Sequence, residues 1–265
     1  MKIIKNKSAC LKIWTKIVAH CNANALLKKH SRILLAVSGG PDSVCMAHFF
    51  TYYGRNNGLD IIMCHLNHGI RGKNADKDAD FVKNLGKKLG IKTILCKADT
   101  PAFAKKSGLS MEHAARKLRY KTLTDVALKN KCGMIATAHH LDDQAETFIL
   151  HLIRGTSAAG LAGIPVRRTA LQKPRNEERG TRNSRTPQSN LKSVFIIRPL
   201  LCLAKKEILG YLKSAGLGYR KDETNDSDKH TRNWIRNRLI PLIEKKQPQF
   251  KRHVLEISAE ISKLL

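Results

Sequence analysis

The feature that most constrains this fold is a glycine-containing loop between an apolar run and a helix-like segment. Ile33 to Val37 is apolar, the loop Ser38-Gly39-Gly40-Pro41-Asp42-Ser43 follows, and Val44 to Phe50 has the character of a helix. This order predicts a strand, a tight turn and a helix N-terminus. The glycines let the backbone approach a ligand closely, and the unpaired N–H groups of the helix end favour a polyphosphate. Because the loop lacks the Gly-x-x-x-x-Gly-Lys-Ser/Thr pattern, it argues against the usual kinase or GTPase.

Strand-like and helix-like segments alternate along the chain. We expect strands at 60–65, 92–96, 134–138 and 194–197, and helices at 76–89, 110–130, 142–153, 205–214, 234–246 and 249–264. This alternation predicts an α/β fold with a doubly wound, Rossmann-like parallel sheet. Ligands of such sheets bind at the carboxyl ends of the strands. The polar segments 65–71 and 139–146 therefore belong to one crevice.

We divide the chain into three parts. Residues 1–30 are a basic N-terminal helix packed on the main domain, because apolar residues recur at helical spacing from Leu11 to Cys21. Residues 31–215 form the α/β domain, interrupted at 167–192 by a disordered basic insertion rich in Arg, Asn, Ser, Thr and Pro. Residues 216–265 are a short helical C-terminal extension. Whether the insertion contacts RNA or is only a tolerated surface loop stays open.

The composition points to a nucleic acid as the leading partner. The chain has 49 Lys and Arg against 21 Asp and Glu, a formal net charge of +28, which generates a strong positive potential. A general lysine bias of the source proteome is the alternative. The seven cysteines show no Cys-x-x-Cys or zinc-like spacing, and no apolar run approaches the ~20 residues of a membrane span. We therefore expect free thiols and a cytoplasmic protein with no membrane segment.

Two segments contain residue types suited to reaction chemistry. Arg116 and Arg119 share a helix face and suit bidentate phosphate binding, although a solvated charged face explains most such pairs. His139, Asp143 and Glu146 lie where a strand gives way to a helix. Helix capping explains one of these acids but not the set. The carboxylates suit Mg²⁺ or a substrate ammonium, and His139 suits a hydrogen bond to developing negative charge.

The blocks that carry a family resemblance follow one another along the chain. They are Ser38 to Ser43, Leu66 to Gly72, Ala114 to Tyr120, Arg154 to Thr156, Gly160 to Pro165, Arg198 to Leu201, Asp222 to Asn225 and Arg232 to Asn237. The loop resembles that of the ATP pyrophosphatase, or PP-loop, superfamily. Together the blocks resemble the tRNA(Ile)-lysidine synthetase family, and the resemblance covers nearly everything from residue 31 to about 245 except the insertion.

This resemblance implies a PP-loop catalytic domain over 31–215 and a two-step ligase reaction. ATP adenylates the C2 oxygen of cytidine 34 in the CAU anticodon of tRNA(Ile) and releases pyrophosphate. Free L-lysine then displaces AMP, which leaves lysidine. ATP and Mg²⁺ are the implied cofactors, and because family members are often dimeric, a homodimer is also open.

The resemblance also assigns roles to residues. The implied ATP-binding residues are Ser38, Gly39, Gly40, Pro41, Asp42 and Ser43, with Asp42 near Mg²⁺. Arg116 or Arg119 neutralises the α-phosphate, with help from His139. Asp143 and Glu146 hold the lysine ammonium or a metal, and their spacing does not decide which. RNA contacts are predicted at His68, Arg71, Arg232 and Arg236.

Two other functions stay open. A tRNA 2-thiocytidine-type sulfur transferase adenylates the same kind of base oxygen, but its Cys-x-x-Cys pairs are absent here. A non-catalytic, RNA-binding relative keeps the fold without the reaction. Many family members continue into longer RNA-binding regions. The sequence therefore leaves open how tRNA(Ile) is distinguished from tRNA(Met). We expect surface charge on the N-terminal helix, the insertion and the tail to compensate.

Overall fold

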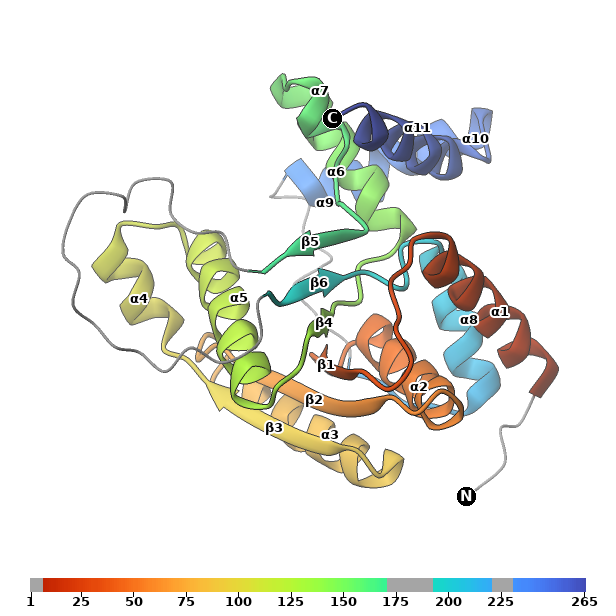
Figure 1. Ribbon diagram of the computed structural model, residues 1–265. Helices are drawn as coiled ribbons and strands as arrows, with labels where there is room; N and C mark the ends of the chain where they lie inside the picture. Colours follow the sequence, from red (N-terminus) through yellow and green to blue (C-terminus); the bar gives the residue numbers. More distant parts are fainter. Residues whose placement is uncertain (1–6, 171–192, 221–230) are drawn as a thin grey trace.

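The computed structural model describes residues 7–170, 193–220 and 231–265, and one sheet lies at its centre (Figure 1). Its strands are β1 (Arg32–Ala36), β2 (Asp60–Asn67), β3 (Lys92–Lys97), β4 (Met134–Ala136), β5 (Arg167–Thr169) and β6 (Phe195–Ile197). They lie in the order β3-β2-β1-β4-β6-β5. All neighbouring pairs are parallel except β5 and β6, which are antiparallel. The predicted α/β class is therefore confirmed.

Helices cover both faces of this sheet. They are α1 (Lys7–Ala23), α2 (Pro41–Asn56), α3 (Lys73–Leu89), α4 (Thr100–Ser107), α5 (Met111–Lys129), α6 (Leu141–Arg154), α7 (Ala158–Leu161), α8 (Lys205–Ala215), α9 (Thr231–Trp234), α10 (Ile240–Lys246) and α11 (Phe250–Leu264). Among the described residues, α1, α2, α3 and α8 share one buried apolar cluster, whereas α5 packs in another. None of the helices in the described ranges combines the length and apolarity that crossing a membrane requires.

Strand β1 shows why the sheet is buried on both faces. Ile33 and Leu35 enter the core beneath α1, α2 and α8, and Leu34 and Ala36 enter the core beneath α5. Successive side chains of a strand point to opposite faces, so a central strand with helices on both sides must be apolar throughout. The run that the sequence presents before the loop is thus the centre of the sheet, and it carries the loop to the carboxyl rim.

The predicted start of the basic insertion at residue 167 is wrong. Residues Arg167–Thr169 form β5 and pair with β6, and the N–H of Ala170 donates to the carbonyl oxygen of Val194 at 2.7 Å. This edge strand escaped prediction because Arg167 and Thr169 are exposed, so the segment has no apolar run. The remainder of the predicted insertion, 171–192, lies outside the described residues.

The helix predicted at 234–246 is interrupted. A π-helical turn, Ile235–Leu239, separates α9 from α10, and the N–H of Ile240 bonds to the carbonyl oxygen of Ile235. Pro241 follows directly and has no N–H, so the regular bond from that position cannot form. Helices α4 and α7 were also not predicted. The division at residues 30 and 215 stays a prediction, although α1 does lie beside α8 (Figure 1).

Candidate active site

The loop Ser38–Ser43 is closed by its own hydroxyl groups. Ser43 Oγ accepts hydrogen bonds from the N–H groups of Ser38 at 3.2 Å and Gly39 at 3.1 Å, and donates to the carbonyl oxygen of Gly40 at 2.9 Å. Gly39 has φ +94°, where a side chain would be strained. Helix α2 then starts without a side-chain cap. Its first N–H groups thus remain available to an anion.

A cavity of about 380 Å³ opens beside this loop. Its walls come mainly from the carboxyl ends of β1 and β2, and include the predicted RNA contacts His68 and Arg71 as well as Arg119. His68 Nδ1 lies 3.2 Å from Thr100 Oγ1, and Arg71 donates to Asp78 Oδ2 at 3.2 Å. The volume and mixed apolar and polar walls suit a small ligand such as a nucleoside. The structure therefore puts two of the predicted RNA contacts in the wall of this cavity.

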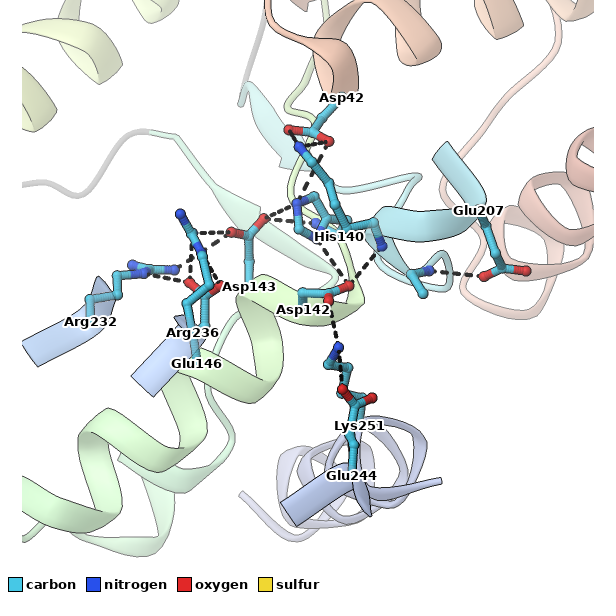
Figure 2. A network of polar contacts seen from close by, with 12 residues as sticks. Asp42, His140, Asp142, Asp143, Glu146, Glu207, Arg232, Arg236, Glu244 and Lys251 are labelled. Carbon is cyan, nitrogen blue, oxygen red and sulfur yellow. Dashed lines mark hydrogen bonds and ion pairs between the residues drawn. The ribbon is translucent and has the colours of Figure 1, made fainter. Parts of the chain in front are cut away.

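A second feature of the rim is a group of acids that are matched by cations, which we call the paired cluster (Figure 2). It consists of Asp42, Asp142, Asp143 and Glu146 with His140, Lys205, Arg232, Arg236 and Lys251. Lys205 Nζ lies 2.7 and 2.8 Å from the two carboxylate oxygens of Asp42. The backbone N–H of Lys205 donates to Asp142 Oδ2 at 2.7 Å. One residue of α8 thus links the loop to the start of α6.

His140 lies at the centre of the paired cluster. Its Nε2 is 3.7 Å from Asp42 Oδ1 and 3.5 Å from Asp143 Oδ2, and its Nδ1 is 3.6 Å from Asp142 Oδ2. Burial alone would lower the pKa of His140, but the neighbouring carboxylates of Asp142, Asp143 and Asp42 outweigh it and raise the pKa. The imidazolium form is therefore more favoured than in a free histidine, and it relieves repulsion among three acids.

Glu146 is fully buried and already binds two cations. Its carboxylate accepts hydrogen bonds from Arg232 Nε at 2.9 Å, and from Arg236 Nε at 2.6 Å and Nη2 at 2.8 Å. The same guanidinium groups lie 3.7 and 3.9 Å from Asp143 Oδ1. Both arginines, predicted as RNA contacts, point to these acids in Figure 2. Any substrate cation would have to share Glu146 with them or displace them.

The third feature, which we call the arginine cluster, consists of Arg116, Arg119, Arg168 and Arg198. The guanidinium carbons of Arg168 and Arg116 lie 4.4 and 5.2 Å from the centroid of the Tyr120 ring. Within the described residues, none of the four arginines has a carboxylate partner. The two arginines predicted as phosphate ligands thus belong to a larger group.

His139 faces this positive charge. Burial, followed by the charges of Arg119 and Arg198, holds the pKa of His139 well below its usual value, so the imidazole is neutral at pH 7. Thr137 Oγ1 lies 3.0 Å from its Nδ1. Two adjacent histidines therefore have opposite pKa shifts, because one faces arginines and the other faces carboxylates.

The structure brings all six predicted catalytic residues to the rim and adds several that the sequence analysis missed. The missed residues are His140, Asp142, Arg168, Arg198 and Lys205. His140 and Asp142 lay inside a segment already singled out, and Arg198 lay inside a quoted block. No feature of the sequence marked Lys205 or Arg168 as a site residue, because a lysine at a helix start and an arginine in a basic stretch are common.

Comparison with known families decides the wider class. The PP-loop domain family matches residues 11–243. The chain belongs to the PP-loop family. This membership implies ATP binding. That the loop Ser38–Ser43, at the N-terminus of α2, binds the ATP stays a prediction.

Curated relatives of this PP-loop protein are named tRNA(Ile)-lysidine synthase. That of Geobacillus kaustophilus is 32% identical over 88% of this chain, and that of Caldanaerobacter subterraneus is 40% identical over 83%. The matches cover 46% and 42% of those proteins, so the chain spans about half the length of the curated relatives that it matches. The predicted resemblance to this family is confirmed.

A solved structure supports the fold. The U34-tRNA thiolase NcsA of Methanococcus maripaludis superposes with a TM-score of 0.76 over 98% of this chain and 82% of the thiolase. The two sequences are 21% identical, so the likeness concerns the arrangement of the sheet and helices alone.

Proposed function

We propose that this PP-loop protein joins L-lysine to C2 of cytidine 34 in the CAU anticodon of tRNA(Ile), converting ATP to AMP and pyrophosphate. The observation that carries the proposal is the similarity to proteins named tRNA(Ile)-lysidine synthase, at 32% to 40% identity over 83% to 96% of the chain. The PP-loop family match, residues 11–243, includes the loop, the residues that line the cavity and the arginine cluster. Free lysine, Mg²⁺, a homodimer and a cytoplasmic location belong to the same proposal.

The first step would take place between the loop and the cavity. The adenosine fits the cavity, and the N–H groups at the start of α2 receive the phosphates. The C2 oxygen of cytidine 34 attacks the α-phosphorus, and the bond to the leaving pyrophosphate breaks. Arg119 lines the cavity, so its charge can stabilise the negative charge that develops there. Neutral His139 can donate a hydrogen bond to the same phosphoryl group.

Asp42 fits the role of a Mg²⁺ ligand. Its carboxylate presents hard oxygen atoms beside the loop, is partly exposed, and already attracts the ammonium of Lys205. Mg²⁺ commonly binds through one or two carboxylates together with phosphate oxygens and water. When bound, the ion supplies positive charge that stabilises the pyrophosphate leaving group. Lys205, released from Asp42, is then placed to contact phosphate oxygens in place of the lysine that the loop lacks.

The second step needs the substrate lysine near the adenylated base. Its ε-amino nitrogen attacks C2, the bond between C2 and the oxygen carried by AMP breaks, and the nitrogen loses its proton. Asp143 supports a site for the ammonium, because its Oδ1 is held only at 3.7 and 3.9 Å by Arg232 and Arg236. Glu146 binds guanidinium groups rather than presenting a vacant set of oxygens. We therefore assign the ammonium to Asp143, whereas Glu146 would contact it only by sharing its oxygens with the two arginines.

Sulfur transfer is less well supported. All seven cysteines lie in described parts of the chain, and burial raises the pKa of Cys45 and Cys64, which disfavours the thiolate form. Within the described ranges, no group of three or more His, Cys, Asp or Glu residues could hold a metal ion.

The test is incorporation of radiolabelled lysine into a tRNA(Ile) transcript with ATP and Mg²⁺. Asp42→Ala and a transcript with uridine at position 34 are the controls. We expect label only with the unchanged protein and cytidine 34. Pyrophosphate release that depends on tRNA but gives no label would retain adenylation and overturn the ligation step. Absence of both would favour the RNA-binding alternative.

A further inference from the structure

Among the residues that the structure describes, no carboxylate pairs with the arginine cluster. Elsewhere at the rim, arginines meet acids: Arg220 Nε lies 2.9 Å from Asp78 Oδ1, and Arg236 Nε lies 2.6 Å from Glu146 Oε1. Around Tyr120, four guanidinium groups gather without a carboxylate partner among the described residues. Like charges held together in a partly buried site repel one another unless an anion joins them.

Two of these arginines also keep hydrogen-bond donors unused. Arg198 is 2% exposed and donates through Nη1 to the carbonyl oxygen of Pro165, but its buried Nε has no partner. The buried Nε of Arg168 has none either. A buried donor without an acceptor destabilises the fold, so each such group in a native protein needs an explanation, and a bound anion is the one that the surrounding positive charge favours. A guanidinium fork matches the oxygens of a phosphate group.

The positions of Arg168 and Arg198 separate these two members of the cluster from the cavity proposed for the nucleotide. The cavity lies at the ends of β1 and β2, whereas Arg168 lies on β5 and Arg198 directly follows β6. In the order β1-β4-β6-β5, β5 is three strands from β1. At about 4.8 Å per strand this is roughly 14 Å, in the direction away from β2. Neither Arg168 nor Arg198 lines the cavity.

We propose that Arg168 and Arg198, together with Arg116, bind a phosphodiester group of the RNA substrate, while Arg119 lies between this site and the nucleotide. The proposal rests on the proposed function only in that the substrate is an RNA. This site holds the RNA chain beside the loop Ser38–Ser43. The other basic surfaces of the protein attract RNA through their charge, without a fixed contact.

The test compares two adjacent arginines of β5. Arg168→Gln removes a guanidinium of the cluster, whereas Arg167→Gln removes one that lies 3.8 Å over the Phe195 ring. Successive residues of a strand point to opposite faces of the sheet, so the two variants remove the same charge from opposite faces of β5. Binding of the CAU-anticodon tRNA(Ile) transcript is measured by filter retention at several salt concentrations, and ATP binding by calorimetry.

We expect Arg168→Gln to weaken tRNA binding about 10-fold and to reduce the slope of log K against log salt by about one phosphate contact. Arg167→Gln should change the affinity by less than about 2-fold, since it makes no fixed phosphate contact. Arg168→Lys should restore part of the loss, because it keeps the charge but not the fork.

Three outcomes would overturn the proposal. Equal losses of tRNA affinity in Arg167→Gln and Arg168→Gln would mean that the protein attracts tRNA through its overall positive charge and not through a fixed contact at Arg168. Loss of ATP affinity in Arg168→Gln without loss of tRNA affinity would assign the anion to the nucleotide. If thermal melting shows that Arg168→Gln unfolds, the exposed Arg116→Gln replaces it, and unchanged tRNA binding in that variant contradicts the site. Because binding is read without lysine transfer, the site can stand even if the proposed ligation fails.

Discussion

The paired cluster and the arginine cluster lie at the same rim but differ in how their charges are balanced. In the first, every acid has a cation within the chain, as Asp42 has Lys205 and Glu146 has Arg232 and Arg236. In the second, the described residues supply no acid for Arg168 or Arg198. A group of charges that is balanced within the chain is stable without a ligand. A group of like charges becomes balanced when a ligand of opposite charge binds. The difference separates Glu146, whose charge is balanced within the chain, from Arg168 and Arg198, whose charge we propose is balanced by a bound RNA phosphate.

The largest expected effect is on stability, from Glu146→Ala. It leaves Arg232 and Arg236 without their buried carboxylate. Removing one partner of a buried ion pair typically costs about 3–5 kcal/mol, and the lower end is expected here because both arginine side chains are 36% exposed. Glu256→Ala is the matched control, since its pair with Arg252 is exposed and should contribute at most about 1 kcal/mol. Urea unfolding followed by circular dichroism measures both. Similar small losses in the two variants would show that the paired cluster does not stabilise the fold.

The next effect is on catalysis, from Asp42→Asn. The carboxylate is partly exposed, so the fold should survive, but the charge that holds Lys205, and that we propose holds Mg²⁺, is lost. We expect pyrophosphate release to fall about 10²–10³-fold, the usual range for removal of one electrostatic contribution at a reaction centre. Release is measured by a coupled assay at saturating ATP. A fall below 10-fold would exclude Asp42 from the reaction centre.

A smaller loss is expected for Lys205→Met, which keeps the stem and removes the ammonium. If Lys205 moves from Asp42 to the phosphates, the variant should raise the KM for ATP and reduce the rate by about 10–100-fold. Lys206→Met, one residue further along α8, is the control. An unchanged rate with a lower melting temperature would restrict Lys205 to holding Asp42 in place.

The smallest effect is a difference in titration between neighbouring histidines. The pKa of His139 is lowered by burial and arginines, so its contribution to stability is complete above about pH 6.5 and is lost as the pH falls. The pKa of His140 is raised by its carboxylates, so its contribution is complete below about pH 6.5 and is lost as the pH rises through the folded value.

NMR of metal-free protein with labelled histidine, assigned with His139→Gln and His140→Gln, measures both. Titration of the two on the same side of pH 6.5 would remove the electrostatic contrast between the clusters. Added inorganic pyrophosphate should raise the pKa of His139 if an anion reaches the arginines that face it.

The sequence predicted those parts of the site whose residues are neighbours along the chain, and missed those whose residues are far apart. The loop around Asp42 and the segment with His139 and Glu146 were predicted, because neighbouring residues carry the pattern. The contact of Lys205 with Asp42 joins residues 163 positions apart and leaves no local trace. Arg232 and Arg236 were predicted as RNA contacts from the family resemblance, which gave no sign that they also bind the buried Glu146; the RNA contact itself stays a prediction. Burial, which decides such partners, is a property of the folded chain.

The most direct measurement is the rate of lysine incorporation into tRNA(Ile) as a function of tRNA concentration, for the unchanged protein, Asp42→Asn and Arg168→Gln. The account predicts that Asp42→Asn lowers the rate at saturating tRNA, whereas Arg168→Gln acts mainly by raising the tRNA concentration for half-maximal rate. Equal effects of both variants on the saturating rate would contradict the separation of chemistry from RNA binding. No incorporation by the unchanged protein would contradict the proposed function itself.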